Sequence, residues 1–409
     1  MIGGIFERAD LRWRHEGQLF AVALPLAVLA TGFAALLIMS LIRSEGRDFG
    51  ATLDFVSFWS AGKLALAGDP AAAYDWETQK SVQAEALGHD LSGWMPFSYP
   101  PTFLALIAGF SRFPLGIALA GWASVTLVFY LAICWTIVPR ASTLLVALAA
   151  GPVWAVCAIG QTGHLTAALL GMALVAERHS HETAALSWAL LTVKPHLGFL
   201  APLWLLCRRR FDLIAKASLF SGLFLLLSFL LFGTSVWTAF MSTISTSIDV
   251  AATSDKRAYS LFASIYGFAR WAGLESGLAL ALHFIVAAPV LILLVRGFGR
   301  GDVSDDLAKA LFLMATAILQ PRLLYYDLAF LTIAGLFLFR HARRSGWLAG
   351  DHVLLTLAAL LPNIVIATGL PLHALTPWLM AIVLLRHLLR VSRHSDAGAP
   401  GDRKTVPIG

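Results

Sequence analysis

The sequence is poor in charged residues. Asp, Glu, Lys and Arg make up only 13% of its 409 residues, whereas they make up about 25% of a typical soluble domain. Hydrophobic residues reach 58%, and the mean hydropathy is +0.75. This composition excludes a soluble globular protein and predicts an all-α polytopic membrane protein.

Cysteine is also scarce, and common cofactor motifs are missing. Cys134, Cys157 and Cys207 lie within or beside apolar segments at spacings unlike those of metal ligands, which argues against a disulfide framework and a zinc site. The sequence has no GxGxxG segment, Walker-type loop or Gly-x-Ser-x-Gly elbow. We therefore expect no cofactor and no metal ion. The net charge of +6 comes from short basic clusters between apolar runs, which indicates membrane topology rather than a nucleic acid partner.

Long apolar runs predict about twelve transmembrane helices, since each needs roughly 20 apolar residues. The clear candidates are 18–42, 115–138, 141–159, 213–233, 276–296, 323–339, 351–369 and 374–391. Shorter apolar pieces lie at 100–113, 163–177, 183–193, 196–207 and 305–319. The first run lacks a small-residue cleavage site, so we expect a retained helix rather than a signal peptide.

The basic clusters predict the orientation, because Lys and Arg concentrate on the cytoplasmic side. They place both termini in the cytoplasm, with the chain in the plasma (inner) membrane. Residues 43–98, called here the outer segment, then lie outside, as does a loop at 234–262. Residues 1–394 are expected to form one integral-membrane domain, and the polar tail 395–409 is expected to be disordered. The clusters are Arg8, Arg12 and Arg14; Arg208, Arg209, Arg210 and Lys216; Arg296 and Arg300; Arg340, Arg343 and Arg344; Arg386, Arg390 and Arg393.

Two arrangements of residues 100–207 fit this orientation. In the first, 100–113 lies along the outer interface and 183–207 is a broken pair of short helices around Lys194-Pro195. In the second, 100–113 spans the membrane and 183–207 is one kinked helix. Counting basic residues favours the first, which places Arg140 and Arg178 inside and Arg112 outside.

The outer segment begins with an expected amphipathic helix that lies on the membrane. Asp54 stands immediately before it, where an Asp is often an N-cap. A carboxylate fixed there is also positioned to accept a proton from a hydroxyl, and the helix start would keep its pKa low. The apolar face of the helix has Phe55, Phe58, Trp59, Gly62 and Leu66, and the other face has Ser57, Ser60 and Lys63.

Two basic residues stand out by their surroundings: Lys194 lies in apolar sequence, and Arg322 lies in an outer turn. Lys194 lies in the middle of an apolar stretch, where an ionisable side chain costs a few kcal/mol unless it is paired or wet. Its partner is either a phosphate or an internal carboxylate. Arg322, in the outer turn that contains Pro321, is suited to clamp a phosphate, while the nearby Asp327 is suited to neutralise either cation. His164 and His196 are single polar residues in apolar surroundings, where a structural role is commoner than a binding role.

The order of these motifs resembles glycosyltransferase family 87. The most specific block is Asp54-Phe55 through Phe58-Trp59-x-Ala61-Gly62, with Leu66, Gly68, Pro70 and Tyr74-Asp75. Tyr99-Pro100-Pro101, Gly160-Gln161, Lys194-Pro195 and the Pro321 turn follow in order. Where family members have a His in the late outer turn, this chain has Arg322, Tyr325, Tyr326 and Asp327.

The resemblance implies a GT-C-type fold and an inverting transferase. The donor would be a polyprenyl-phosphate-linked sugar, mannose or another hexose, and the acceptor a lipid or glycan at the outer face of the membrane lipids. Asp54 would be the catalytic base, with Asp48 in reserve, and Lys194 and Arg322 would bind the donor phosphate. Expected contacts to the sugar or acceptor are Trp59, Tyr74, Asp75, Tyr99, Gln161, His164, His196, Tyr326 and Asp327.

Two other functions compete with the transferase. A secondary transporter would use Lys194 and Asp327 for coupling or for substrate, although such proteins usually have two related halves and the outer segment occurs once. A non-catalytic membrane subunit of a glycolipid or polysaccharide assembly system would tolerate the loss of Asp54, whereas an enzyme would not.

Overall fold

The computed structural model describes residues 54–90, 95–149, 152–253 and 256–397. Within them the chain is all-helical, and its one β-bridge joins Phe262 to Leu324. The first half contains α2 (Asp54–Leu66), η2 (Pro70–Tyr74), α3 (Trp76–Leu87), α4 (Pro101–Phe110), α5 (Leu115–Ile137), α6 (Ala141–Ala149), α7 (Val153–Ile159), α8 (Gly163–Ala176), α9 (His181–Leu190), η3 (Leu191–Val193), α10 (Pro195–Gly198) and α11 (Ala201–Cys207). The second half contains α12 (Phe211–Thr253), α13 (Lys256–Tyr259), α14 (Ile265–Trp271), α15 (Ser276–Arg296), α16 (Asp305–Leu319), η4 (Tyr325–Leu328), α17 (Ala329–Ser345), α18 (Asp351–Thr368), η5 (Leu372–Leu375) and α19 (Thr376–Ala397).

Four stretches of the described chain are long and apolar enough to cross a membrane: 115–137, 211–244, 276–296 and 372–393. A fifth arises if the bent pair α6 and α7 forms one span. The predicted count of about twelve is therefore not reached by helix length and composition. The reason is that α8, α16 and α17 have fewer than 18 residues. The predicted span 18–42 lies outside the described residues.

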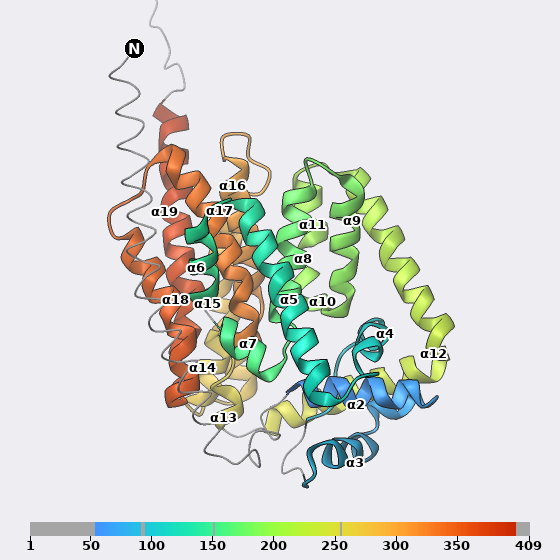
Figure 1. Ribbon diagram of the computed structural model, residues 1–409. Helices are drawn as coiled ribbons and strands as arrows, with labels where there is room; N and C mark the ends of the chain where they lie inside the picture. Colours follow the sequence, from blue (N-terminus) through green and yellow to red (C-terminus); the bar gives the residue numbers. More distant parts are fainter. Residues whose placement is uncertain (1–53, 91–94, 150–151, 254–255, 398–409) are drawn as a thin grey trace, which may run out of the picture.

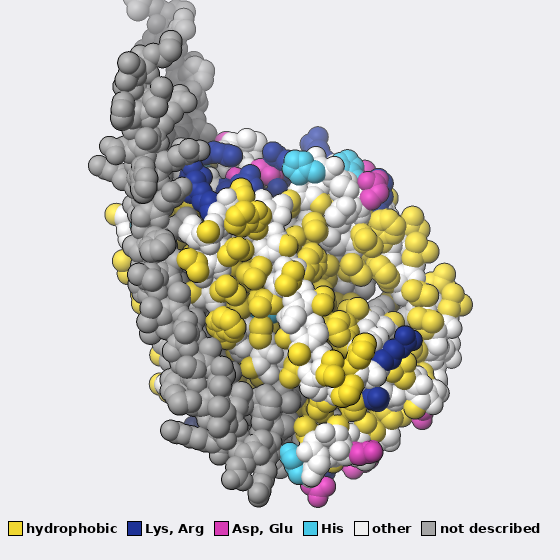
Figure 2. All heavy atoms as spheres, in the orientation of Figure 1, with side chains coloured by type: hydrophobic (Ala, Val, Ile, Leu, Met, Phe, Trp, Pro, Cys, Tyr) yellow, Lys and Arg dark blue, Asp and Glu magenta, His cyan; other side chains and the backbone are white. Residues whose placement is uncertain are grey.

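The core is built around α16 and α17. Nearly all residues of α16 are buried, and α17 packs against it and against α8. Helices α12 and α15 lie at the periphery and expose many leucines. Exposed apolar side chains on long outer helices are what a lipid environment requires, and Figure 2 shows hydrophobic side chains across the middle of the molecule.

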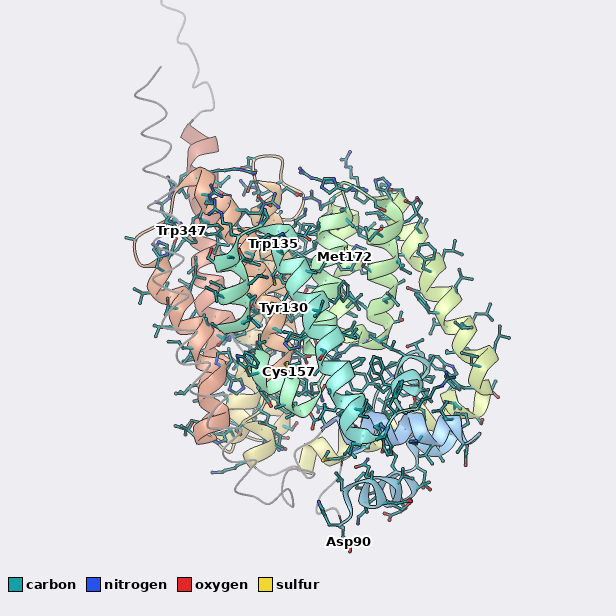
Figure 3. The ribbon with its side chains drawn as sticks, viewed as in Figure 1. Asp90, Tyr130, Trp135, Cys157, Met172 and Trp347 are labelled. Carbon is teal, nitrogen blue, oxygen red and sulfur yellow. The ribbon has the colours of Figure 1, made fainter. Side chains whose placement is uncertain are left out.

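The two ends of the molecule differ in composition. At one end, called here the basic end, charged side chains gather along the upper edge of Figure 2. It consists of the turns 177–181, 207–212, 297–306 and 340–351. The other end, called here the site end, carries α2, η2, α3 and α4 (Figure 1). In Figure 3, Tyr130 lies between Trp347 near the basic end and Asp90 at the site end.

Residues 181–210 leave the basic end and return to it. Arg210 donates to the carbonyl oxygen of Glu177, and the His181 ring lies 2.8 Å from Asp212, so the two feet of the segment are adjacent. Its tip is the break at Lys194-Pro195, between η3 and α10. This hairpin, α9 to α11, has the shape of the first arrangement expected from the sequence. Arg178 and Arg208 also share Asp305, which puts both arginines at one end.

Two local expectations were wrong. The loop predicted at 234–262 is helical as far as Thr253, because α12 continues beyond Gly233, whose φ of 75° and ψ of 179° bend the helix. Beyond the bend it packs on η2, where Thr243 donates to the carbonyl oxygen of Tyr74 at 3.0 Å. Helix α2 does not expose a polar face, since Ser57 and Ser60 are buried and the Ser60 hydroxyl bonds to Val56 and Gln79. The tail prediction falls partly on α19, which ends at Ala397, and otherwise outside the described residues.

Candidate functional site

A chain of polar contacts runs through the site end, beginning at Asp54. The Gln161 amide nitrogen donates to Asp54 Oδ2 at 2.6 Å. The oxygen of the same amide accepts from the Tyr99 hydroxyl at 3.1 Å and from the backbone N–H of Thr162 at 3.1 Å. Three segments far apart in sequence therefore meet: the start of α2, the segment before α4, and the turn between α7 and α8.

The contacts continue to Lys194 at the tip of the α9–α11 hairpin. The Tyr99 hydroxyl lies 3.0 Å from Thr162 Oγ1, which accepts from Lys194 Nζ at 3.3 Å. Lys194 Nζ also lies 2.6 Å from Asp327 Oδ1, and both side chains are almost fully buried. We call the six residues Asp54, Gln161, Tyr99, Thr162, Lys194 and Asp327 the polar chain.

Aromatic rings enclose the ion pair in the polar chain. Lys194 Nζ lies 4.9 Å from the ring centroid of Tyr326 and 5.7 Å from that of Tyr99. Ring faces attract a cation, and a buried pair is tolerated only with good geometry and additional hydrogen bonds. Lys194 thus has the internal carboxylate partner that was one of its two predicted partners, and the phosphate role stays a prediction.

Two glycines allow the turn between α7 and α8 to pack closely against α2 on one side and η4 on the other. Gly160 ends α7 with a φ of 70°, a conformation that favours glycine. A Cβ there would lie 2.5 Å from Phe55 Cβ, next to Asp54. A Cβ on Gly163 would fall on the carbonyl oxygen of Tyr326. The turn that carries Gln161 and Thr162 is therefore pressed between α2 and η4, which places their side chains between Asp54 and Lys194.

The environment of Asp54 differs from the one expected. Asp54 is the first residue of α2, and its carboxylate contacts Gln161 across the site. Burial raises the pKa of this carboxyl above its usual value, while the Gln161 hydrogen bond and the charge of Lys194 act in the opposite direction. The prediction of a low pKa at this position was wrong, because loss of hydration on burial is the largest influence on it.

Three predicted contacts of the outer segment have structural partners. The Trp59 indole donates to the carbonyl oxygen of Phe113 at 2.9 Å, and its ring remains partly exposed beside Lys63. Tyr74 donates to the carbonyl oxygen of Tyr99 at 2.9 Å and packs among buried rings. The exposed Asp75 caps α3 by accepting from Thr78 N at 2.9 Å and Thr78 Oγ1 at 2.6 Å, which lowers the pKa of Asp75.

The remaining predicted residues lie apart from the polar chain. Arg322 is exposed, with its guanidinium 5.8 Å from the ring centroid of Tyr266 in α14. His196 is exposed on α10, and its carbonyl oxygen accepts from Gln320 at 2.7 Å. His164 is buried and stacks on Tyr130 at 5.3 Å, with neither ring nitrogen bonded to a described residue. Asp48 lies outside the described residues.

Thr162 belongs to the polar chain but was not among the predicted site residues. It links Tyr99 to Lys194 through its hydroxyl, and it fixes the Gln161 amide through its backbone N–H. The available signal was its place inside Gly160-Gln161-Thr162-Gly163-His164, a polar turn between two apolar segments. Among the described residues, no group of three His, Cys, Asp or Glu side chains is placed to hold a metal ion.

One of the comparisons with known proteins finds a match. The model of glycosyltransferase family 87 matches residues 97–324, more than half of the chain. The matched region contains Tyr99, Gln161, Thr162 and Lys194, whereas Asp54 precedes it and Asp327 follows it by three positions. Comparison with curated proteins and with solved structures finds no match. On the extent of the family match, this chain belongs to glycosyltransferase family 87.

Proposed function

We propose that this membrane glycosyltransferase moves a hexose, such as mannose, from a polyprenyl-phosphate donor to a lipid or glycan acceptor. The observation that carries the proposal is the polar chain, in which a partly buried carboxylate and a buried cation are joined by contacts of 2.6–3.3 Å. A glycosyl transfer of this type needs a base for the acceptor hydroxyl and a cation for the departing phosphate. Asp54 is suited to be the base, and Lys194 is suited to be the cation.

The proposed reaction is a single in-line displacement with inversion. The acceptor oxygen attacks the anomeric carbon as the bond from that carbon to the phosphate oxygen breaks. Asp54 takes the hydroxyl proton, and polyprenyl phosphate leaves with the bonding electron pair. The raised pKa of Asp54 suits this role, since a base is most effective when its pKa approaches the working pH.

Lys194 cannot meet the donor phosphate as a free cation. Lys194 Nζ lies 2.6 Å from Asp327 Oδ1. A bound phosphate would therefore either share the Lys194 ammonium with Asp327 or displace Asp327 from it. A second cation reduces the electrostatic repulsion that the donor phosphate meets from the carboxylates of Asp54 and Asp327. Arg322 is proposed for this purpose, because it is exposed and has no carboxylate partner among the described residues, so that its guanidinium is able to turn toward a bound phosphate.

The fold and membrane orientation belong to the same proposal. We propose a GT-C-type arrangement with the site end outside the cell and both termini in the cytoplasm. The positive-inside rule supports this orientation, because Arg178, Arg208, Arg340 and Arg344 gather at the basic end. The partly exposed rings of Trp59 and Tyr99 are proposed as surfaces for the sugar.

The test is sugar transfer by the purified protein. Polyprenyl-phosphate mannose and a membrane lipid extract are supplied, and mannosylated product is measured for the parent, Asp54→Asn and Asp69→Asn. Loss of a general base lowers the rate by about 10²–10⁴-fold. Asp69→Asn makes the same chemical change in the exposed N-cap of η2 and should leave transfer close to that of the parent.

Three outcomes separate the candidates. Transfer that survives in Asp54→Asn removes Asp54 as the base. Absence of transfer by the parent from any polyprenyl-phosphate sugar contradicts the donor class and favours a non-catalytic subunit. A Lys194→Ala protein that binds the donor as tightly as the parent removes Lys194 from the phosphate site.

A further inference from the structure

The amide of Gln161 has only one orientation compatible with its neighbours. A backbone N–H can only donate, so Thr162 N requires the oxygen of the amide at 3.1 Å. The NH₂ group must then face Asp54, to which it donates at 2.6 Å. The Tyr99 hydroxyl donates to the same amide oxygen at 3.1 Å and holds the orientation from a second side.

This orientation favours one protonation state of Asp54. An NH₂ group offers protons and accepts none, so it stabilises the ionised carboxylate that a base requires. Gln161 is itself 95% buried, with a 5% exposed fraction, and therefore has little alternative bonding to water. The sequence predicts this residue as a contact to the sugar or acceptor, but both polar ends of its amide are already used within the protein.

We propose that Gln161 is a positioning residue, which aims the carboxylate of Asp54 and keeps it ionised, and that Tyr99 and Thr162 lock Gln161 in place. The inference rests on the proposed role of Asp54 as a base and adds to it. It assigns no contact between Gln161 and substrate.

Several other charged or titratable side chains lie near Asp54. Lys194, at the hairpin tip, favours the ionised carboxylate. In the same surroundings, Tyr325 and Tyr326 of η4 are buried and Tyr99 is partly exposed, and Asp327 is paired with Lys194. A tyrosine ordinarily has a pKa of about 10, so these phenols stay neutral on the acid side of the pH profile. The acid side of the pH profile is therefore expected to report Asp54.

The experiment is the pH dependence of transfer by Gln161→Met. Methionine keeps the length of the side chain and removes the donor. Loss of a hydrogen bond to a charged group raises the pKa of Asp54 further, so the acid limb of the kcat profile should move to higher pH by about one unit. The sign follows because the base is active only above its pKa. The KM for the donor should not change, since Gln161 is not assigned a substrate contact.

Three further variants make the result specific. Gln161→Glu places a second carboxyl beside Asp54 and should move the acid limb higher still, because two adjacent carboxyls do not both ionise readily. Tyr99→Phe removes one of the two donors to the amide oxygen and should give a smaller shift in the same direction. Gln83→Met removes another buried amide, which bonds to Gln79 and Met95 away from Asp54, and should leave the acid limb unchanged.

A second measurement needs no turnover. Infrared difference spectra between low and high pH, with Asp54→Asn as the reference, record the ionisation of the Asp54 carboxyl directly. If Gln161→Met shows the same Asp54 midpoint as the parent, the proposal is wrong even if transfer is reduced. A raised KM with an unmoved acid limb would also overturn it and would assign Gln161 to the sugar. A parent that titrates as described but transfers no sugar would instead contradict the proposed function alone.

Discussion

The basic end and the site end hold their charges in different ways. At the basic end, Asp305 contacts Arg178 at 3.3 Å and Lys309 at 2.7 Å, and it also contacts Arg208. Arg178 is 62% exposed there. At the site end, Lys194 has one carboxylate partner, and the side chains of the pair are 7% and 1% exposed.

The contrast separates two uses of charge in one membrane protein. Several cations around one carboxylate replace one another, and exposed pairs contribute little individually. A single buried pair has no replacement, and breaking it leaves a charge without compensation. Single substitutions in the Asp305 cluster should therefore have small effects, whereas substitutions in the Lys194–Asp327 pair should affect stability and chemistry together.

The largest expected effect is at Asp327. Asp327→Ala leaves Lys194 buried and unpaired, which should cost about 3–5 kcal/mol of stability, measured as a large fall in the apparent midpoint of thermal unfolding in detergent. The double variant Lys194→Met/Asp327→Leu should recover most of that stability, because two apolar side chains replace the pair. It should still fail to transfer sugar. Recovery of transfer in the double variant would show that the pair is purely structural.

A smaller effect is expected from packing in the turn between α7 and α8. Gly163→Ala adds a methyl group where the carbonyl oxygen of Tyr326 lies, which should cost about 1–3 kcal/mol through overpacking. It should also reduce transfer, since Thr162 and Gln161 shift with the turn.

Gly109→Ala is the matched control for that substitution. A Cβ on Gly109 meets nothing within 4 Å, and the residue lies inside α4. Alanine there should raise stability by roughly 0.5–1 kcal/mol, the ordinary gain over glycine in a helix. Equal effects of the two alanines on transfer would mean that the turn is not held against η4.

The smallest effect is expected at the basic end. Arg178→Ala removes an exposed member of the Asp305 cluster, and Lys309 and Arg208 remain. The loss should be no more than about 1 kcal/mol, and transfer should match the parent. If Arg178→Ala destabilises the protein as strongly as Asp327→Ala, the distinction between the two ends fails.

The sequence allowed part of the site to be predicted because its residues are conspicuous. A lysine in apolar sequence, a carboxylate at a helix start and a polar turn between apolar helices each stand out, and the structure brings Asp54, Gln161, Lys194 and Asp327 together. Thr162 was missed because a threonine is ordinary in any helix turn. Its importance depends on which neighbours the fold supplies.

Other features were beyond prediction from local patterns. The continuation of α12 past Gly233 depends on packing against η2, and sequence around a glycine favours a loop. The raised pKa of Asp54 depends on how deeply α2 is buried, which its alternating apolar and polar residues do not reveal. The direction of Arg322 toward Tyr266 likewise depends on where α14 lies.

The α9–α11 hairpin bears on the side of the membrane on which the later turns of the chain lie. The thirty or so residues that bring Lys194 to the site leave the basic end and return to it, so on the proposed orientation they make no net crossing of the membrane. Reporter proteins inserted near 179 and near 210 should therefore lie in the same compartment. If the proposed orientation holds, the membrane side of each later turn, including the one that carries Arg322, depends on this return to the basic end and not only on the number of apolar segments that precede it.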